Sequence, residues 1–195
     1  MAAFIIEGRI PFPSFGKIKK MMASDPGTVH ALLDKLTEMC ITFIPAQVKA
    51  GADVIMFLDL GPARFSPAHY QEFAFPYAKR VINTIKTPEV PIFSHTDGTS
   101  FLSAPLADLK VDIFGFDWTI DLSEGIKRIG GKKTVLGNMD PYILFGPDRE
   151  IEKKVREIVA AGKEAPAHIF SLGGWIIPDT PVEKVKFLVD LVHSL

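Results

Sequence analysis

Two kinds of segment alternate along the chain. The first kind is short, apolar and rich in β-branched residues, which is typical of strands that are covered on both faces. Its members are Ala52–Leu60, Val90–His95, Val111–Asp117, Thr134–Asn138 and His168–Leu172. The second kind repeats apolar residues at helical spacing, and its members are Thr28–Ala50, Pro76–Lys86, Phe101–Leu109, Leu122–Ile129, Arg149–Ala161 and Pro181–Leu195. The alternation predicts an α/β fold in which parallel strands are joined by right-handed crossovers.

Residues at the predicted helix ends agree with these boundaries. Asp121 stands directly before one helix, where its side chain is expected to cap the first turn, and Gly162 follows the end of another. Pro45 lies inside the first long helix and is expected to bend or break it. With 195 residues and no internal repeat or linker, we expect a single domain.

Composition narrows the class of protein. Hydrophobic residues make up 47% of the chain and charged residues 23%, with a formal net charge of −1, so the sequence predicts a globular core and neither a nucleic-acid nor a membrane partner. A single cysteine, Cys40, excludes internal disulfides and fits a reducing compartment. The N-terminus lacks the pattern of a signal peptide. We therefore expect a cytoplasmic protein.

Polar residues stand where the predicted strands end. They are Asp59, His95, Asp97, Asp117, Asn138 and Asp140. In barrels of parallel strands, and in open α/β sheets, the carboxyl ends of the strands carry the active site. No glycine-rich phosphate-binding motif follows any strand, so nucleotide binding has no support. The sequence predicts that these polar side chains converge on one site that takes a small-molecule substrate.

Several runs also resemble a known family. They are Ala50–Asp53, Glu72–Tyr77, Phe114–Asp121, Leu136–Pro141 and Leu172–Gly174 followed by Pro178. Together, and in this order, they resemble the uroporphyrinogen decarboxylase superfamily from Met1 to the end of the chain. The resemblance implies a (β/α)8 barrel of the TIM type, of which only the last five βα units are present here.

Two activities occur in that superfamily: cofactor-free decarboxylation of uroporphyrinogen III, and zinc-dependent methyl transfer between a corrinoid and an acceptor. At the positions of the decarboxylase's active-site tyrosine, serine and histidine, this chain has Phe4, Leu60 and Gly174. These replacements oppose decarboxylation, because a polycarboxylate substrate needs cationic and hydrogen-bonding partners. We therefore expect a metal-dependent, corrinoid-linked methyltransferase. The alternatives are a uroporphyrinogen decarboxylase of tetrapyrrole biosynthesis and a truncated, non-catalytic fragment or subunit.

The methyltransferase pattern places His-x-Cys after the fifth barrel strand. Here His95-Thr96-Asp97 keeps the histidine and replaces the cysteine by a carboxylate. The resemblance thus implies that His95 and Asp97 bind zinc or another divalent metal, with Asp59 as a possible third ligand. Asp59, Asp117 and Asn138 are the predicted catalytic residues. The methyl donor would be a corrinoid carried by a partner protein.

A simpler interpretation of the same residues stays open. Asp97-Gly98 is also a favourable turn sequence, in which Asp97 accepts backbone hydrogen bonds and His95 meets only water. Five strands of a barrel would also leave two uncovered edges and exposed apolar surface. We therefore expect self-association, or dependence on a missing N-terminal segment.

Overall fold

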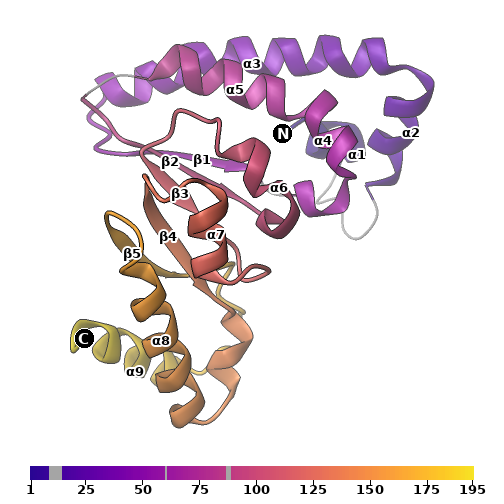
Figure 1. Ribbon diagram of the computed structural model, residues 1–195. Coiled ribbons are helices and arrows are strands. Elements are labelled where there is room, and N and C mark those ends of the chain that lie inside the picture. Colours follow the sequence, from indigo (N-terminus) through magenta and orange to yellow (C-terminus); the bar gives the residue numbers. More distant parts are fainter. Residues whose placement is uncertain (9–14, 60, 87–88) are drawn as a thin grey trace. The chain divides into compact units, whose positions relative to one another are not determined.

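The computed structural model describes residues 1–8, 15–59, 61–86 and 89–195. Within these residues, five strands form one sheet in which spatial order follows chain order (Figure 1). They are β1 (Ile55–Asp59), β2 (Ile92–Thr96), β3 (Ile113–Gly115), β4 (Thr134–Met139) and β5 (His168–Leu172). Leu60, the last residue of the first predicted strand, lies outside the described residues. A parallel sheet built from successive strand–helix units confirms the predicted α/β fold with five βα units.

Helices follow the strands as the sequence pattern predicts, but additional short ones occur. The α-helices are α1 (Ala2–Glu7), α2 (Gly16–Ser24), α3 (Pro26–Lys49), α4 (Pro67–Phe73), α5 (Phe75–Ile85), α6 (Thr99–Leu106), α7 (Leu122–Arg128), α8 (Asp148–Gly162) and α9 (Val182–His193). The 3-10 helices η1 (Pro62–Arg64) and η2 (Pro141–Phe145) lie in the loops after β1 and β4. Pro45 lies inside α3 and does not end it, because the helix continues to Lys49.

The described residues group into two compact units. The first comprises Met1–Ile55 and Gly61–Ile92, and the second comprises Met56–Leu60 and Phe93–Leu195. In the first unit, α3 packs along α5, and the guanidinium of Arg80 on α5 pairs with the carboxylates of Asp34 and Glu38 on α3. The prediction of a single domain stays a prediction.

The second unit holds the sheet and its covering helices. Helix α8 packs on β4 and β5, α9 packs on α8, and α7 contacts β4 (Figure 1). The side chains of Phe116, Val135, Met139, Ile151 and Val155 are fully buried between these layers. Burial of this kind is the main favourable contribution to the folding free energy.

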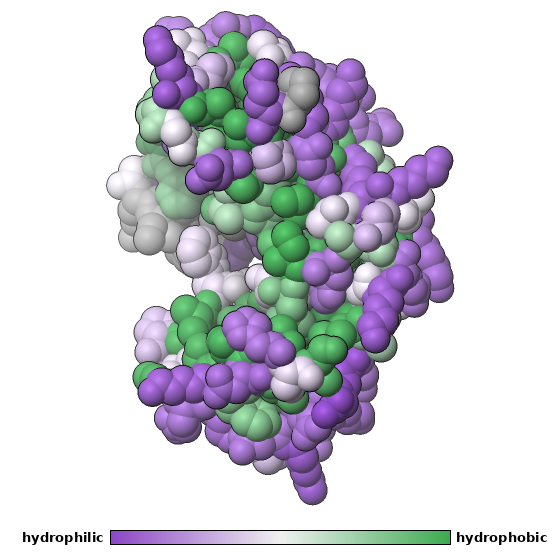
Figure 2. Space-filling model, turned by 90° about the vertical axis from the view of Figure 1, so that its left-hand side faces the viewer, coloured by the Kyte–Doolittle hydropathy of each residue, from purple (hydrophilic) through white to green (hydrophobic). Residues whose placement is uncertain are grey.

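The outer strands of the sheet expose apolar side chains. Met56 and Leu58 on β1 are 57% and 44% exposed, and Ile169 on β5 is 43% exposed. Figure 2 shows that hydrophobic residues, in green, reach the surface among hydrophilic ones on the face that it presents. An outer strand has a neighbouring strand on one side only, which leaves part of its surface uncovered. Self-association, or completion by a further segment, remains a prediction. None of the described helices is long and apolar enough to cross a membrane.

Candidate functional site at the carboxyl ends of the strands

The register of the sheet brings the predicted polar residues to one edge. His95 lies opposite Gly115, and Gly115 lies opposite Leu136. Two residues further along each chain, Asp97, Asp117 and Asn138 therefore stand at the same level. Asp97 and Asp117 lie just beyond their strands, and Asn138 lies in the last part of β4, where it pairs with Ser171 of β5. The backbone N–H of Asp97 also donates a hydrogen bond to the carbonyl oxygen of Asp59, at 3.4 Å. All the predicted site residues that end β1 to β4 thus lie along one edge.

Asp117 is the most enclosed carboxylate at this edge, with 1% of its surface exposed. Its Oδ2 atom accepts a hydrogen bond from the backbone N–H of Gly98 at 2.5 Å. Its Oδ1 atom accepts from the Thr99 hydroxyl at 2.5 Å, and from the hydroxyl and backbone N–H of Thr119 at 2.6 and 3.2 Å. Because these donors occupy both oxygens, the carboxylate joins the loop after β2 to the loop after β3.

Asn138 extends this network to β4. Its side-chain amide nitrogen donates to the carbonyl oxygens of Asp117 at 2.9 Å and Ile120 at 2.7 Å, and the residue is 6% exposed. Asp121, in the same loop, accepts a bond from the backbone N–H of Glu124 at 3.1 Å and caps α7, as the sequence predicts. Asp117 and Asn138 are therefore both engaged in holding the 117–121 loop.

His95 stands beside this network at the end of β2. Its Nδ1 atom is buried and has no hydrogen-bond partner among the described residues. The ring lies against Gly115, where an added Cβ would be 2.8 Å from Nδ1. Burial lowers the pKa of His95 below its ordinary value, and the nearby carboxylates of Asp117 and Asp97 offset part of that effect. The folded protein therefore favours a neutral imidazole at this position.

The donor set for a metal is incomplete in the described part of the chain. No group of three or more His, Cys, Asp or Glu side chains lies close enough there to hold an ion. His95 and Asp97 offer a nitrogen and a carboxylate, which suit zinc. If a metal bound to Nε2 of His95, the proton of the neutral imidazole would lie on Nδ1. No described residue accepts a hydrogen bond from Nδ1, and a buried donor without an acceptor costs about 1–3 kcal/mol. The residues fit a weak site that needs further ligands.

Two positions bear on the decarboxylase alternative. Phe4 lies on α1 and is 42% exposed. Gly174 lies against the indole of Trp118, where an added Cβ would be 2.3 Å from Cζ3. A histidine or cysteine at position 174 would therefore require the Trp118 ring to move. The third replaced position, Leu60, lies outside the described residues.

One contact escaped the sequence reasoning, which treated His168 as an ordinary strand residue. Its Nε2 atom lies 2.8 Å from the carbonyl oxygen of Gly137, so that nitrogen carries the donated proton. Its ring also packs on Gly162 of α8, where an added Cβ would be 2.1 Å from Nδ1. Gly137 itself has φ +133° and precedes a cis peptide bond to Asn138. No local sequence signal marks this contact, because it joins residues 31 positions apart.

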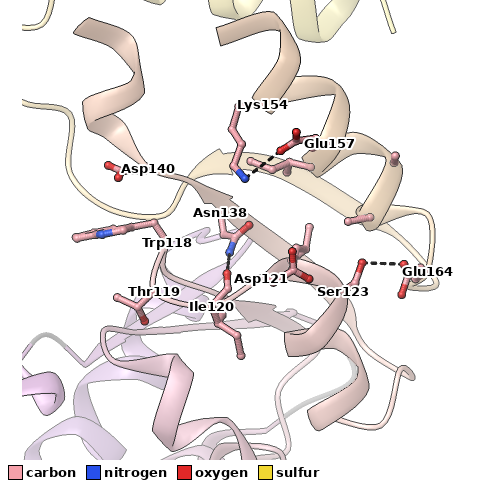
Figure 3. A pocket seen from close by; sticks show the side chains of 14 residues that line it. Trp118, Thr119, Ile120, Asp121, Ser123, Asn138, Asp140, Lys154, Glu157 and Glu164 are labelled. Carbon is pink, nitrogen blue, oxygen red and sulfur yellow. Dashed lines mark hydrogen bonds and ion pairs between the residues drawn. The ribbon is translucent and has the colours of Figure 1, made fainter. Parts of the chain in front are cut away.

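A groove of about 630 Å³ lies in the second unit, between the 118–123 segment and α8 (Figure 3). Asn138 and Asp140 line it, whereas His95, Asp97 and Asp117 do not. Lys154 and Glu157 of α8 line its opposite side, together with Glu164, which follows the end of that helix. Sequence reasoning missed Lys154 and Glu157 because they look like the solvated face of an amphipathic helix, and Glu164 because it looks like an ordinary loop residue. The volume lies within the range of small-molecule pockets.

Parallel strands, a helix after each strand and a polar edge at the carboxyl ends define an α/β protein of the (β/α)8 type, present here in part. The uroporphyrinogen decarboxylase (URO-D) family model matches residues 1–195, and the chain belongs to that family. Uroporphyrinogen decarboxylase of Rhodococcus opacus is 38% identical, and that of Citrifermentans bemidjiense is 35% identical. The matches cover all of this chain but only 56% and 57% of those relatives.

A solved structure shares the fold. The methyltransferase from Methanosarcina mazei superposes with a TM-score of 0.78 over 99% of this chain and 62% of its own, at 22% sequence identity. At that identity the likeness shows the fold alone. The chain therefore spans little more than half of the length of the proteins that it resembles, which agrees with the prediction of a partial barrel.

Proposed function

We propose that this chain carries part of the active site of a metal-dependent methyltransferase within the uroporphyrinogen decarboxylase family. The observation that supports this proposal is the pair His95 and Asp97 at the carboxyl end of β2, with the backbone of Asp59 bonded to that of Asp97 at 3.4 Å. The acceptor would be a small molecule, and the donor a methyl-corrinoid held by a partner protein. Zinc or another divalent ion would bind at His95 and Asp97.

The chain's own residues would have distinct roles. A bound metal lowers the pKa of the acceptor group and orients it. Asp117 holds Gly98, the residue directly after Asp97, and so fixes the loop that presents the metal-binding pair. Asn138 fixes the 117–120 segment in turn. We assign positioning roles to Asp117 and Asn138, and keep Asp59 as the candidate that touches substrate.

Calorimetric zinc titration tests the metal site. We expect weak binding by the parent chain, and binding at least tenfold weaker for His95→Ala and for Asp97→Ala. His193→Ala is the matched control, because His193 is exposed on α9 and far along the chain from β2. Affinity should fall as His95 becomes protonated at acidic pH. Equal binding by all four proteins, or none by the parent, would exclude the metal site.

Decarboxylation is the second candidate, and the names of the relatives reported above favour it. The replacements at Phe4 and Gly174 oppose it, since neither supplies a hydrogen bond or charge to a carboxylated substrate. We expect no conversion of uroporphyrinogen III by the purified chain. Clear turnover would replace the methyltransferase proposal with the decarboxylase one. Failure of both zinc binding and turnover would favour a non-catalytic fragment or subunit.

A further inference from the structure

A second group of ionisable side chains lies in the first compact unit, where α3 packs against α4 and α5 (Figure 1). It consists of His30 on α3, Glu72 on α4 and Tyr77 on α5. Glu72 and Tyr77 end the 72–77 run, which is one of those that resemble the family. The proposed methyltransferase site uses none of the three residues. Helix packing thus brings a carboxylate, an imidazole and a phenol together.

His30 lies in the middle of this group. Its Nδ1 atom is 2.7 Å from the hydroxyl oxygen of Tyr77, and its Nε2 atom is 3.8 Å from a carboxylate oxygen of Glu72. The carboxylate favours the tautomer with its proton on Nε2, because the other tautomer would turn a lone pair towards the negative charge. Nδ1 of His30 therefore accepts a hydrogen bond that the Tyr77 hydroxyl donates.

Packing holds the imidazole ring in this orientation. The ring of His30 stacks on that of Phe73, with centroids 4.7 Å apart and planes 12° apart, and Phe73 is buried. The His30 side chain is nevertheless 35% exposed, and Tyr77 is half-buried. The hydrogen bond between His30 and Tyr77 is therefore fixed in its geometry and accessible to small molecules from solution.

Tyr77 needs such a partner in order to react as a nucleophile. Burial raises the pKa of its hydroxyl above the ordinary value, the charge of Asp34 adds to this effect, and Arg80 opposes it. The free phenolate is therefore scarce near neutral pH. A neutral imidazole in contact with the hydroxyl can remove the proton while the oxygen attacks, which is general-base catalysis.

We propose that Tyr77 is a modification site that accepts an acyl group from a small activated ester or thioester, with His30 as the general base. The Tyr77 oxygen forms a bond to the carbonyl carbon of the donor, and the phenolic proton moves to Nδ1 of His30. The bond between that carbon and the leaving group breaks, and the leaving group departs as its anion. Glu72 stabilises the imidazolium, which then releases its proton to water. The proposal does not depend on the methyltransferase function.

Acetylation of the full chain by p-nitrophenyl acetate tests the proposal, with peptide mass spectrometry to locate the acetyl groups. The chain has three tyrosines, of which Tyr70 is 2% exposed and Tyr142 is 62% exposed. General-base catalysis contributes about 10²–10⁴-fold to a rate, so Tyr77 should be acetylated at least about tenfold faster than the more exposed Tyr142. If the bond to His30 served packing alone, Tyr142 would react first.

Two variants separate the base from the hydrogen bond. His30→Gln keeps a hydrogen-bond acceptor for Tyr77 but removes the base, and it should slow acetylation of Tyr77 at least about tenfold. Glu72→Gln should slow it about twofold to fivefold, as expected for the loss of one partly exposed charge pair. Circular dichroism verifies that each variant is folded.

His69→Gln is the matched control, because His69 is exposed on α4 and its ring packs edge-on against Phe73 at 6.4 Å. The control should leave the rate at Tyr77 unchanged, and the rate at Tyr142 should stay the same in all the variants. The proposal is wrong if Tyr142 reacts faster than Tyr77 in the parent. It is also wrong if His30→Gln leaves the Tyr77 rate unchanged or raises it, or if His69→Gln lowers that rate as much as His30→Gln.

Discussion

The carboxylate of Asp117 joins two loops at the site edge, and its replacement by asparagine isolates the contribution of the negative charge. The substitution keeps the size of the side chain and turns one oxygen into an N–H donor. In the better of its two orientations, the amide oxygen replaces Oδ1 and still accepts from Thr99 and Thr119. The amide nitrogen then faces the backbone N–H of Gly98, so two donors meet.

The magnitude follows from these contacts. A buried donor without an acceptor costs about 1–3 kcal/mol, and each charged hydrogen bond that becomes neutral loses about 1 kcal/mol. Relief from burying a charge offsets part of this loss. We therefore expect Asp117→Asn to lower the free energy of unfolding by about 2–4 kcal/mol, or the melting temperature by roughly 4–16 °C in a chain of this length.

Urea denaturation followed by tryptophan fluorescence measures this change, and amide exchange localises it. The amide protons of Gly98 and Thr119 should lose protection before those of the core strands. Asp179→Asn is the matched control, because Asp179 is exposed and a substitution there should stay within about 0.5 kcal/mol of the parent. The reasoning fails if Asp117→Asn is as stable as the control, or if protection is lost uniformly along the chain.

Three further predictions concern packing, pH and assembly. Gly162→Ala should destabilise the fold by about 1–3 kcal/mol, because the new Cβ displaces the His168 ring and breaks its hydrogen bond to Gly137. Gly27→Ala, in the first turn of α3, should be neutral or stabilising, and thermal melts of the two variants compare them directly. Burial lowers the pKa of His95 in the folded state below its unfolded value of about 6.5, so the unfolded state binds more protons and stability should fall as the pH drops below about 6.5. In chelator-treated samples, a His95→Gln variant should lose that part of the dependence of unfolding free energy on pH. An unchanged pH dependence would contradict the assignment. The exposed apolar side chains on the outer strands should promote self-association, so sedimentation velocity should detect species larger than a monomer; a stable monomer at all concentrations would contradict this prediction.

Much of the fold follows from local sequence patterns. Strand β5 has the predicted limits, and the Asp121 cap was expected, because apolar runs and capping residues act within a few positions. Helix α2 was not predicted. It begins after Phe15, which has a left-handed backbone and packs on Gly61 and Phe65, contacts that lie more than 40 residues away. Elements that depend on distant packing leave little trace in local hydrophobic periodicity.

The candidate site likewise combines features that local sequence patterns predict with contacts that depend on tertiary structure. The edge on which Asp59, His95, Asp117 and Asn138 lie could be predicted, since parallel strands present their carboxyl ends together. The partners of Asp117 could not, because Gly98 and Thr99 are 19 and 18 residues away and reach it only through the register of β2 and β3. The groove also depends on tertiary structure, because it forms where α8 lies next to the 118–123 segment.

The side chains of Asp117 and Asn138 join the loops after β2 and β3 to each other and to strand β4. We therefore expect these two loops to move together, so a molecule that shifts one of them should shift the other. The loops after β1, β4 and β5 lie outside this set of side-chain bonds. We expect variation in substrate size among relatives to be accommodated by those three loops, and insertions in the two fastened loops to be tolerated least.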